Sequence, residues 1–146
     1  MTITSIETIR AVSDLITSLF DEPPTTKDIS EGFTRPCSYV QLAGSSSARE
    51  GALRHDTFAV EIIRFGARTD RGWIELLHYR EALASALLSP LPVGDGACLF
   101  PDDIDFILRR DEMVLITSFT VDLYQELPPE DADAVLMETL TIRKED

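Results

Sequence analysis

The sequence predicts an α+β fold, with a mostly antiparallel sheet of about four to five strands and two helices packed on one face. Two segments carry apolar residues at helical spacing, and several shorter segments alternate apolar and polar residues as strands do. These segments follow one another in the order α-β-β-α-β-β-β. No internal repeat or linker divides the chain, so residues 1–146 are expected to form a single domain.

The first helix is expected to run from about Ser5 to Phe20. Thr4 and Glu7 have the spacing of a capping box, a hydroxyl residue followed three positions later by glutamate. The helix should end before Pro23. Its apolar residues are Ile6, Ile9, Val12, Leu15, Ile16, Leu19 and Phe20.

An antiparallel pair of strands is expected next. Residues 27–31 form a short extended piece, and Pro36 can take the first position of a strand that continues to Leu42. Residues 44–56 are small and polar without periodicity, which predicts a mobile loop. Residues 57–65 carry apolar side chains on both faces, as a central strand does.

The second helix is expected from Asp70, a plausible N-cap, through Leu88. Ser89 and Pro90 then end it. The apolar stripe of this helix consists of Trp73, Leu76, Leu77, Leu83, Ala84 and Leu87.

The last third of the chain reads as strands joined by turns. Residues 91–103 are rich in turn-forming residues, and residues 104–109 alternate as a strand. Residues 113–124 give the clearest strand signal of the chain, with every second residue apolar or threonine. After an acidic, proline-containing turn, residues 135–143 are expected to return as a last antiparallel strand.

The composition limits the classes of partner. A formal charge of −13 and a pI near 4.4 argue against a nucleic-acid binder, which needs clustered basic residues. The acidity suits a surface past which DNA slides, a DNA mimic, or plain solubility. No apolar run approaches the ~20 residues that span a bilayer, and the N-terminus does not resemble a signal peptide. Residence in a cytoplasm, with Cys37 and Cys98 reduced, is the default expectation.

Enzyme chemistry has no support in the sequence. The only histidines, His55 and His78, accompany no nucleophile motif. The carboxylates of Asp102, Asp103 and Asp105 lack the spacing of a calcium loop and suit a solvated turn. No phosphate-binding loop is present. We therefore expect neither catalytic residues nor a cofactor or metal site.

Two regions are candidate assembly contacts. Arg49 and Arg54 lie in the expected loop of an otherwise acidic chain, and such loops often become ordered on a partner. The alternative is an ordinary flexible loop. Leu136, Leu140 and Ile142 lie in the expected last strand, which is apolar on both faces. That strand either meets another subunit or forms an ordinary edge of the chain's own sheet.

One segment carries a family resemblance that covers nearly the whole chain in its order of elements. After an amphipathic helix, the chain reads Asp-Ile-x-Glu-Gly-Phe-x-x-Pro-Cys-x-Tyr-Val-x-Leu over residues 28–42, and strand-like residues 58–65 and 113–124 follow. This arrangement resembles the tail terminator proteins of long-tailed bacteriophages. The part after Tyr124 departs from the pattern. The residues that carry the resemblance most firmly are Gly32, Phe33, Pro36, Cys37, Tyr39 and Leu42.

The resemblance implies a structural role in the virion, at the head-proximal neck of the tail. Such proteins assemble as a homohexameric ring on the tail tube protein, stop tube polymerisation and offer a docking face to the head-tail connector or stopper protein. DNA would be passing cargo without specific binding, and no membrane is involved. Two alternatives stay open: an acidic DNA mimic that inhibits a host DNA-binding protein, and another neck protein for head closure or tail completion.

Overall fold

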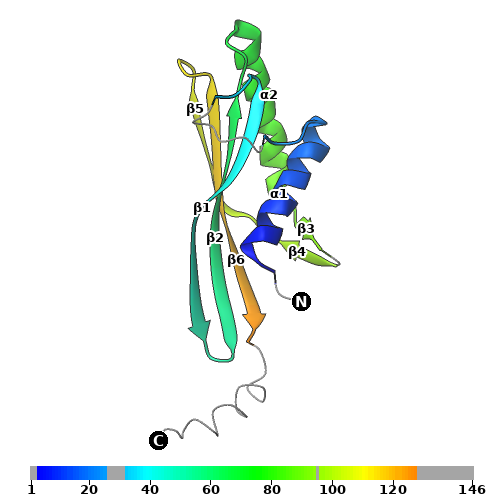
Figure 1. The fold of residues 1–146 in the computed structure, drawn as a ribbon, viewed down its shortest axis with the longest axis vertical. Coiled ribbons are helices and arrows are strands. Elements are labelled where there is room, and N and C mark those ends of the chain that lie inside the picture. The colour runs from blue at the N-terminus through cyan, green and yellow to red at the C-terminus, as the bar shows by residue number, and fades with distance from the viewer. Residues whose placement is uncertain (1–2, 26–31, 95, 128–146) are drawn as a thin grey trace, which may run out of the picture.

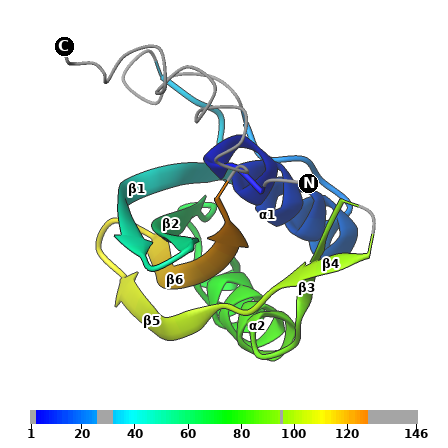
Figure 2. The same cartoon turned by 90° about the horizontal axis from the view of Figure 1, so that it is seen from below.

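The computed structural model describes residues 3–25, 32–94 and 96–127. Figure 1 shows an elongated molecule with one long sheet, and Figure 2 shows both helices on the same side of that sheet. The α+β class, the mostly antiparallel sheet and the order of elements are confirmed. The elements are α1 (Ser5–Phe20), β1 (Cys37–Glu50), β2 (Leu53–Phe65), α2 (Asp70–Leu87), β3 (Leu91–Val93), β4 (Ala97–Leu99), β5 (Asp102–Arg109) and β6 (Val114–Glu126).

Helix α1 begins at the predicted capping box. The backbone N–H of Glu7 donates to Thr4 Oγ1 at 3.3 Å, and the N–H of Thr4 donates to Glu7 Oε1 at 2.7 Å. These two bonds satisfy donors that the first turn would otherwise leave free. The helix ends where Asp21 adopts a left-handed conformation, with φ of 54°. Its buried face, which includes Val12 and Ile16, packs into the core.

Replacing Thr4 with alanine is expected to lower the free energy of unfolding by about 1 kcal/mol, because the N-cap bond is lost. Urea unfolding followed by circular dichroism measures the change. Thr17→Ala is the matched control, since the Thr17 hydroxyl is exposed and only donates to the Ser13 carbonyl one turn earlier. Equal losses in the two variants would contradict a special role for the cap.

The predicted mobile loop at residues 44–56 is wrong. Strand β1 continues to Glu50, and β2 begins at Leu53, so only two residues turn the hairpin. The two strands stay paired from Cys37 opposite Phe65 to Glu50 opposite Leu53, with one irregularity between Leu42 and Gly44. The serine-rich half of β1 is exposed along its length, so it carries no hydrophobic alternation that could reveal a strand. Backbone pairing with β2 alone defines it.

Helix α2 departs from the prediction at its start and in its apolar stripe. The N-cap is Thr69 rather than Asp70, because the Gly72 N–H donates to Thr69 Oγ1 at 2.9 Å. Leu77, expected to face the core, is exposed, and Tyr79 is buried instead. The helix ends at Leu87, one residue before the predicted end.

The sheet has the order β1-β2-β6-β5, with every neighbouring pair antiparallel. Strand β2 is therefore central, as predicted from its two apolar faces. The turn-rich segment at 91–103 also contains the short hairpin β3–β4 and the first residues of β5. The expected extended piece at 27–31 and the expected last strand at 135–143 lie outside the described residues.

The core lies between the helices and the sheet. Alternate residues of β6 are buried there, in agreement with the predicted inward face. The largest fully buried side chains are Phe119, Ile16, Ile62, Leu76, Leu83, Leu87, Leu99, Leu115, Val12, Val60 and Val121.

Candidate functional site

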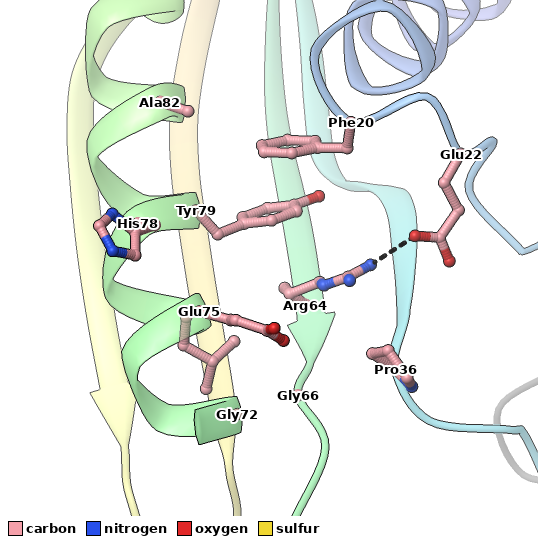
Figure 3. Close-up of a pocket in the computed structure, with 11 residues that line it drawn as sticks. Phe20, Glu22, Pro36, Arg64, Gly66, Gly72, Glu75, His78, Tyr79 and Ala82 are labelled. Carbon is pink, nitrogen blue, oxygen red and sulfur yellow. Dashed lines mark hydrogen bonds and ion pairs between the residues drawn. The ribbon is translucent and has the colours of Figure 1, made fainter. Parts of the chain in front are cut away.

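A cleft of about 350 Å³ opens between the end of α1, the start of β1 and the first turns of α2 (Figure 3). Three side chains form a column beside it. The Phe20 and Tyr79 rings stack with centroids 3.7 Å apart, and the Arg64 guanidinium carbon lies 4.9 Å from the Tyr79 centroid on the ring face. The cleft therefore has a preformed wall of planar groups.

Hydrogen bonds fix that wall. The Tyr79 and Ser38 hydroxyls lie 2.6 Å apart, and Arg64 donates to Ser38 Oγ at 3.0 Å. Burial raises the pKa of Tyr79 to about 12, so its hydroxyl stays protonated near neutrality. Arg64 also reaches the Glu22 carboxylate at 3.4 Å. Such a rigid column with a single charged pair suits protein contact, and Glu75 and His78 of α2 also line the cleft.

The segment that carries the family resemblance, residues 32–42, anchors the chain where it enters β1. Gly32 has φ of +96°, in the region that favours glycine, and the Phe33 ring lies 4.3 Å from the Phe65 ring. Arg35 lies over both rings, with its guanidinium carbon 5.4 and 5.3 Å from their centroids. The same guanidinium donates to the carbonyls of Gly66, Glu112 and Met113 at 3.1–3.3 Å. The motif thus joins the starts of β1 and β6 to the end of β2.

The remaining motif residues lie along the first half of β1. Pro36 lines the cleft and is preceded by a cis peptide bond, one residue before the strand begins. Cys37 opens the strand half-buried, and burial raises the pKa of its thiol. Tyr39 lines a neighbouring groove against α1, and Leu42 is exposed. The motif is thus brought together at one end of β1, with Leu42 at its far limit.

The second feature of interest is a bare arm, which we define as residues 43–57 of the β1–β2 hairpin and residues 120–126 of β6. It extends past the helices at the end of the molecule from which β6 leads to the C-terminus (Figure 1). Arg49 and Arg54 lie directly opposite each other near its tip. Both candidate contact residues thus belong to a regular hairpin instead of the expected loop.

A buried carboxylate holds the arm together. Asp56 has no exposed surface and accepts hydrogen bonds from Ser47 and from Arg54, whose Nε lies 2.8 Å from Asp56 Oδ2. Burial tends to raise the pKa of Asp56, but the bonds from Ser47 and Arg54 outweigh it and hold the pKa below its usual value. Gln125 approaches the same carboxylate and exchanges two hydrogen bonds with the backbone of Ile3. The arm is therefore tied to the N-terminal segment.

His55 forms a second polar clamp on the arm. Its Nε2 lies 2.9 Å from Asp122 Oδ1 and its Nδ1 lies 2.8 Å from Glu50 Oε2. The imidazole also stacks on Tyr124, with ring centroids 4.2 Å apart. The contact with Asp122, supported by Glu50, raises the pKa of His55 above its ordinary value of 6.5. The pKa of Asp122 is lowered by hydrogen bonds from Thr57 and His55.

These shifts predict a pH dependence of the arm's stability. A raised folded-state pKa means that the contribution of His55 is fully present below pH 6.5 and is lost as the pH rises through the folded value. The pKa of Asp122 is lowered instead. The contribution of Asp122 to stability is therefore lost only as the pH falls through its folded-state pKa, which lies below 3.8. Wild type should therefore lose more stability than His55→Gln between pH 6 and pH 9 in urea titrations. Equal losses of stability in the two proteins would contradict a stabilising role for the contacts of His55 with Asp122 and Glu50.

Comparison with protein-family models gives a match to phage tail terminator proteins over residues 7–134. The match spans most of the chain, including both helices, the whole sheet, the cleft and the arm. The chain belongs to the phage tail terminator family. Comparison with curated proteins gives no match. The resemblance identified from the sequence is thereby confirmed, and the protein is a structural component of a phage tail.

Several residues of this tail terminator were not identified from the sequence. Arg35 and Arg64 bond to groups that are distant in the chain, Asp56 bonds to Ser47 and Arg54 within the hairpin, and no motif marks any of the three. The only signal was the placement of the arginines within apolar segments, and Asp56 gave none because it fell in the expected loop. The candidate contacts Leu136, Leu140 and Ile142 lie outside the described residues.

Over the described ranges 3–25, 32–94 and 96–127, no group of three His, Cys, Asp or Glu side chains could hold a metal ion. Within the same ranges, no helix is both long and apolar enough to cross a membrane.

Proposed function

We propose that this protein closes the finished tail tube as a homohexameric ring, stops further tube polymerisation and offers a docking face to the head-tail connector or stopper protein. Membership of the tail terminator family carries the proposal. In this proposal, residues 1–146 act as a single domain, made in the host cytoplasm and incorporated at the head-proximal end of the tail.

The shape of the subunit supports a ring. A closed ring needs two different patches on each subunit, one meeting the other on the next copy. The cleft lies beside the start of β1 (Figure 3), whereas the bare arm carries the end of the same strand. Two dissimilar surfaces are therefore presented at opposite ends of one long sheet. We assign the arm, with Arg49 and Arg54, to contacts with neighbouring subunits or the tube.

The motif residues have a positioning role in this proposal. Phe33 and Arg35 fix the entry to β1, so they set the direction of the strand that carries the arm. The net charge of −13 on each copy suits passage of DNA without sticking, because a lumen lined by acids repels phosphates over about 8 Å at physiological salt. A lumen that proved neutral or basic in an assembled ring would contradict this part of the proposal.

Electron microscopy of lysates from the parent phage with this reading frame deleted tests the function. We expect headless tails of excessive, variable length, and restoration of normal particles by the wild-type gene supplied in trans. Tails of normal length that fail to join heads would assign the protein to another neck position. Intact infectious particles would overturn a role in assembly and favour the DNA-mimic alternative.

A further inference from the structure

The two edges of the four-stranded sheet differ in how they are protected. Exposed sheet edges invite pairing with other chains, and proteins guard them with charges, prolines and irregularities. Strand β5 is guarded by three aspartates and Arg109, and its register with β6 is irregular between Asp102 and Asp105. Strand β1 also has one irregularity, between Leu42 and Gly44, but from Gly44 to Ala48 it pairs with β2 without interruption and has no charge and no proline. The β1 edge is therefore the unguarded one.

The backbone of that edge is available for pairing. Among the described residues, β1 pairs only with β2, and one further backbone bond reaches it, from the Thr25 N–H to the Ser38 carbonyl. From Leu42 to Glu50 the strand is exposed on both faces. The serines and alanines there present little side-chain bulk to an incoming strand.

We propose that residues 135–143 of a neighbouring copy add to this edge as an antiparallel strand, so that each subunit is joined to the next by its C-terminal segment. This inference deepens the proposed ring and rests on it. Residues 135–143 combine β-branched and large apolar side chains with a single acid before Arg143, a composition that favours strand addition.

Chain connectivity permits this contact. Strand β6 ends at the arm tip, where the Leu127 N–H donates to the Ala52 carbonyl in the β1–β2 turn. The seven residues from Pro128 to Ala134 can span up to about 24 Å. The adjacent prolines Pro128 and Pro129 favour an extended course over a tight return to the same sheet. In this proposal the C-terminal segment leaves its own sheet at the arm tip and reaches the β1 edge of the next copy.

Charge complementarity favours the antiparallel direction. With Val135 placed opposite Ala48, the acidic residues 130–133 lie beside the arginine pair formed by Arg49 and Arg54. At the other end, Arg143 falls near Glu61, which lies next to β1 and accepts a hydrogen bond from Gln41. The reverse direction would bring the acids toward Glu61.

Burial distinguishes a neighbour's segment from the chain's own. Both faces of the arm are bare around β1, so a strand added by the same chain would leave its apolar side chains in water. At two-residue spacing Leu136, Leu140 and Ile142 share one face of a strand, interrupted only by Glu138. In this proposal the body of the second subunit, approaching with its own segment, covers that face.

Photo-crosslinking in assembled phage particles tests the inference. The chain contains three methionines, and photo-methionine replaces them without a change of size. Met137 lies in the proposed strand, whereas Met113 is buried in the core and reports only contacts within its own subunit. After irradiation we expect a covalent dimer whose digest joins a peptide containing Met137 to one containing residues 44–48. Met137→Leu should abolish that dimer and leave the Met113 products.

Every other outcome of the crosslinking experiment contradicts the proposed pairing of residues 135–143 with β1. A Met137 crosslink confined to the monomer band would assign the segment to its own chain. A Met137 crosslink to the tube protein or to another surface, or none in particles that contain the protein, would refute the pairing and leave the ring proposal intact. Absence of the protein from particles would instead refute the proposed function itself.

Discussion

Gly72→Ala should lower the free energy of unfolding by about 3 kcal/mol, the upper part of the usual range for overpacking. A Cβ at this position would lie 2.0 Å from the carbonyl oxygen of Ala67 and 2.8 Å from its carbonyl carbon. Both atoms are backbone, and the same oxygen accepts a hydrogen bond from the Thr69 N–H. The turn before α2 would therefore have to move, which would disturb the N-cap bond and the cleft wall.

Thermal unfolding measures this effect, and a fall in Tm of about 10 °C is expected for a chain of this size. Gly44→Ala is the matched control, since a Cβ there meets nothing within 4 Å and the residue lies in a strand. That variant should stay within about 0.5 kcal/mol of wild type. A small loss in Gly72→Ala, similar to that in the control, would contradict the close approach at α2.

The parts of the fold that bury a regular apolar face were predictable. Helix α1 combines a capping box with an apolar stripe that buries Val12 and Ile16, although the predicted stripe residues Ile6 and Leu19 are exposed, and β6 alternates buried with half-buried or exposed residues along most of its length. In both cases local preference and burial agree, so the sequence pattern sufficed. Residues 57–65 of β2 were placed correctly because apolar residues lie on both faces, whereas residues 53–56 were assigned to the loop.

The β1 part of the arm could not be predicted because residues 43–50 bury almost nothing. Residues 43–50 of β1 are held by backbone pairing with β2, and the polar residues that brace the arm come from three strands. Asp56 resembles a loop residue in the sequence, yet it is fully buried through its bonds to Ser47 and Arg54. Long-range polar contacts of this kind leave no periodic pattern in the sequence.

The cleft could not be predicted for the same reason. Its wall depends on Phe20 at the end of α1 meeting Tyr79 in the middle of α2, and no local signal relates those two positions. Misplacing Leu77 in the core followed from treating every leucine of α2 as buried. Tyr79 is buried instead because its hydroxyl forms a hydrogen bond with Ser38 and its ring stacks between two planar side chains.

The double variant Leu136→Asp with Leu140→Asp should reduce the yield of infectious particles by about three orders of magnitude. Each leucine buried between subunits contributes about 2 kcal/mol, and about 4 kcal/mol in total corresponds to roughly a thousandfold change in association. Stability of the isolated subunit should be unchanged, because in this proposal both side chains are buried only by the next copy. Plaque titres of the deletion phage, complemented by each variant, measure the effect.

Ala132→Asp with Ala134→Asp is the matched control, because it adds the same two charges to the same segment outside the apolar run. That variant should retain a titre within tenfold of wild type. Equal titres for the two double variants, whether high or low, would show that the leucines have no specific role. A fall in Tm of Leu136→Asp with Leu140→Asp would instead assign them to the subunit's own fold. The predicted combination, lost assembly with an unchanged Tm, is expected if the segment contacts a partner outside its own subunit, and the Met137 crosslink then distinguishes a second copy from the tube.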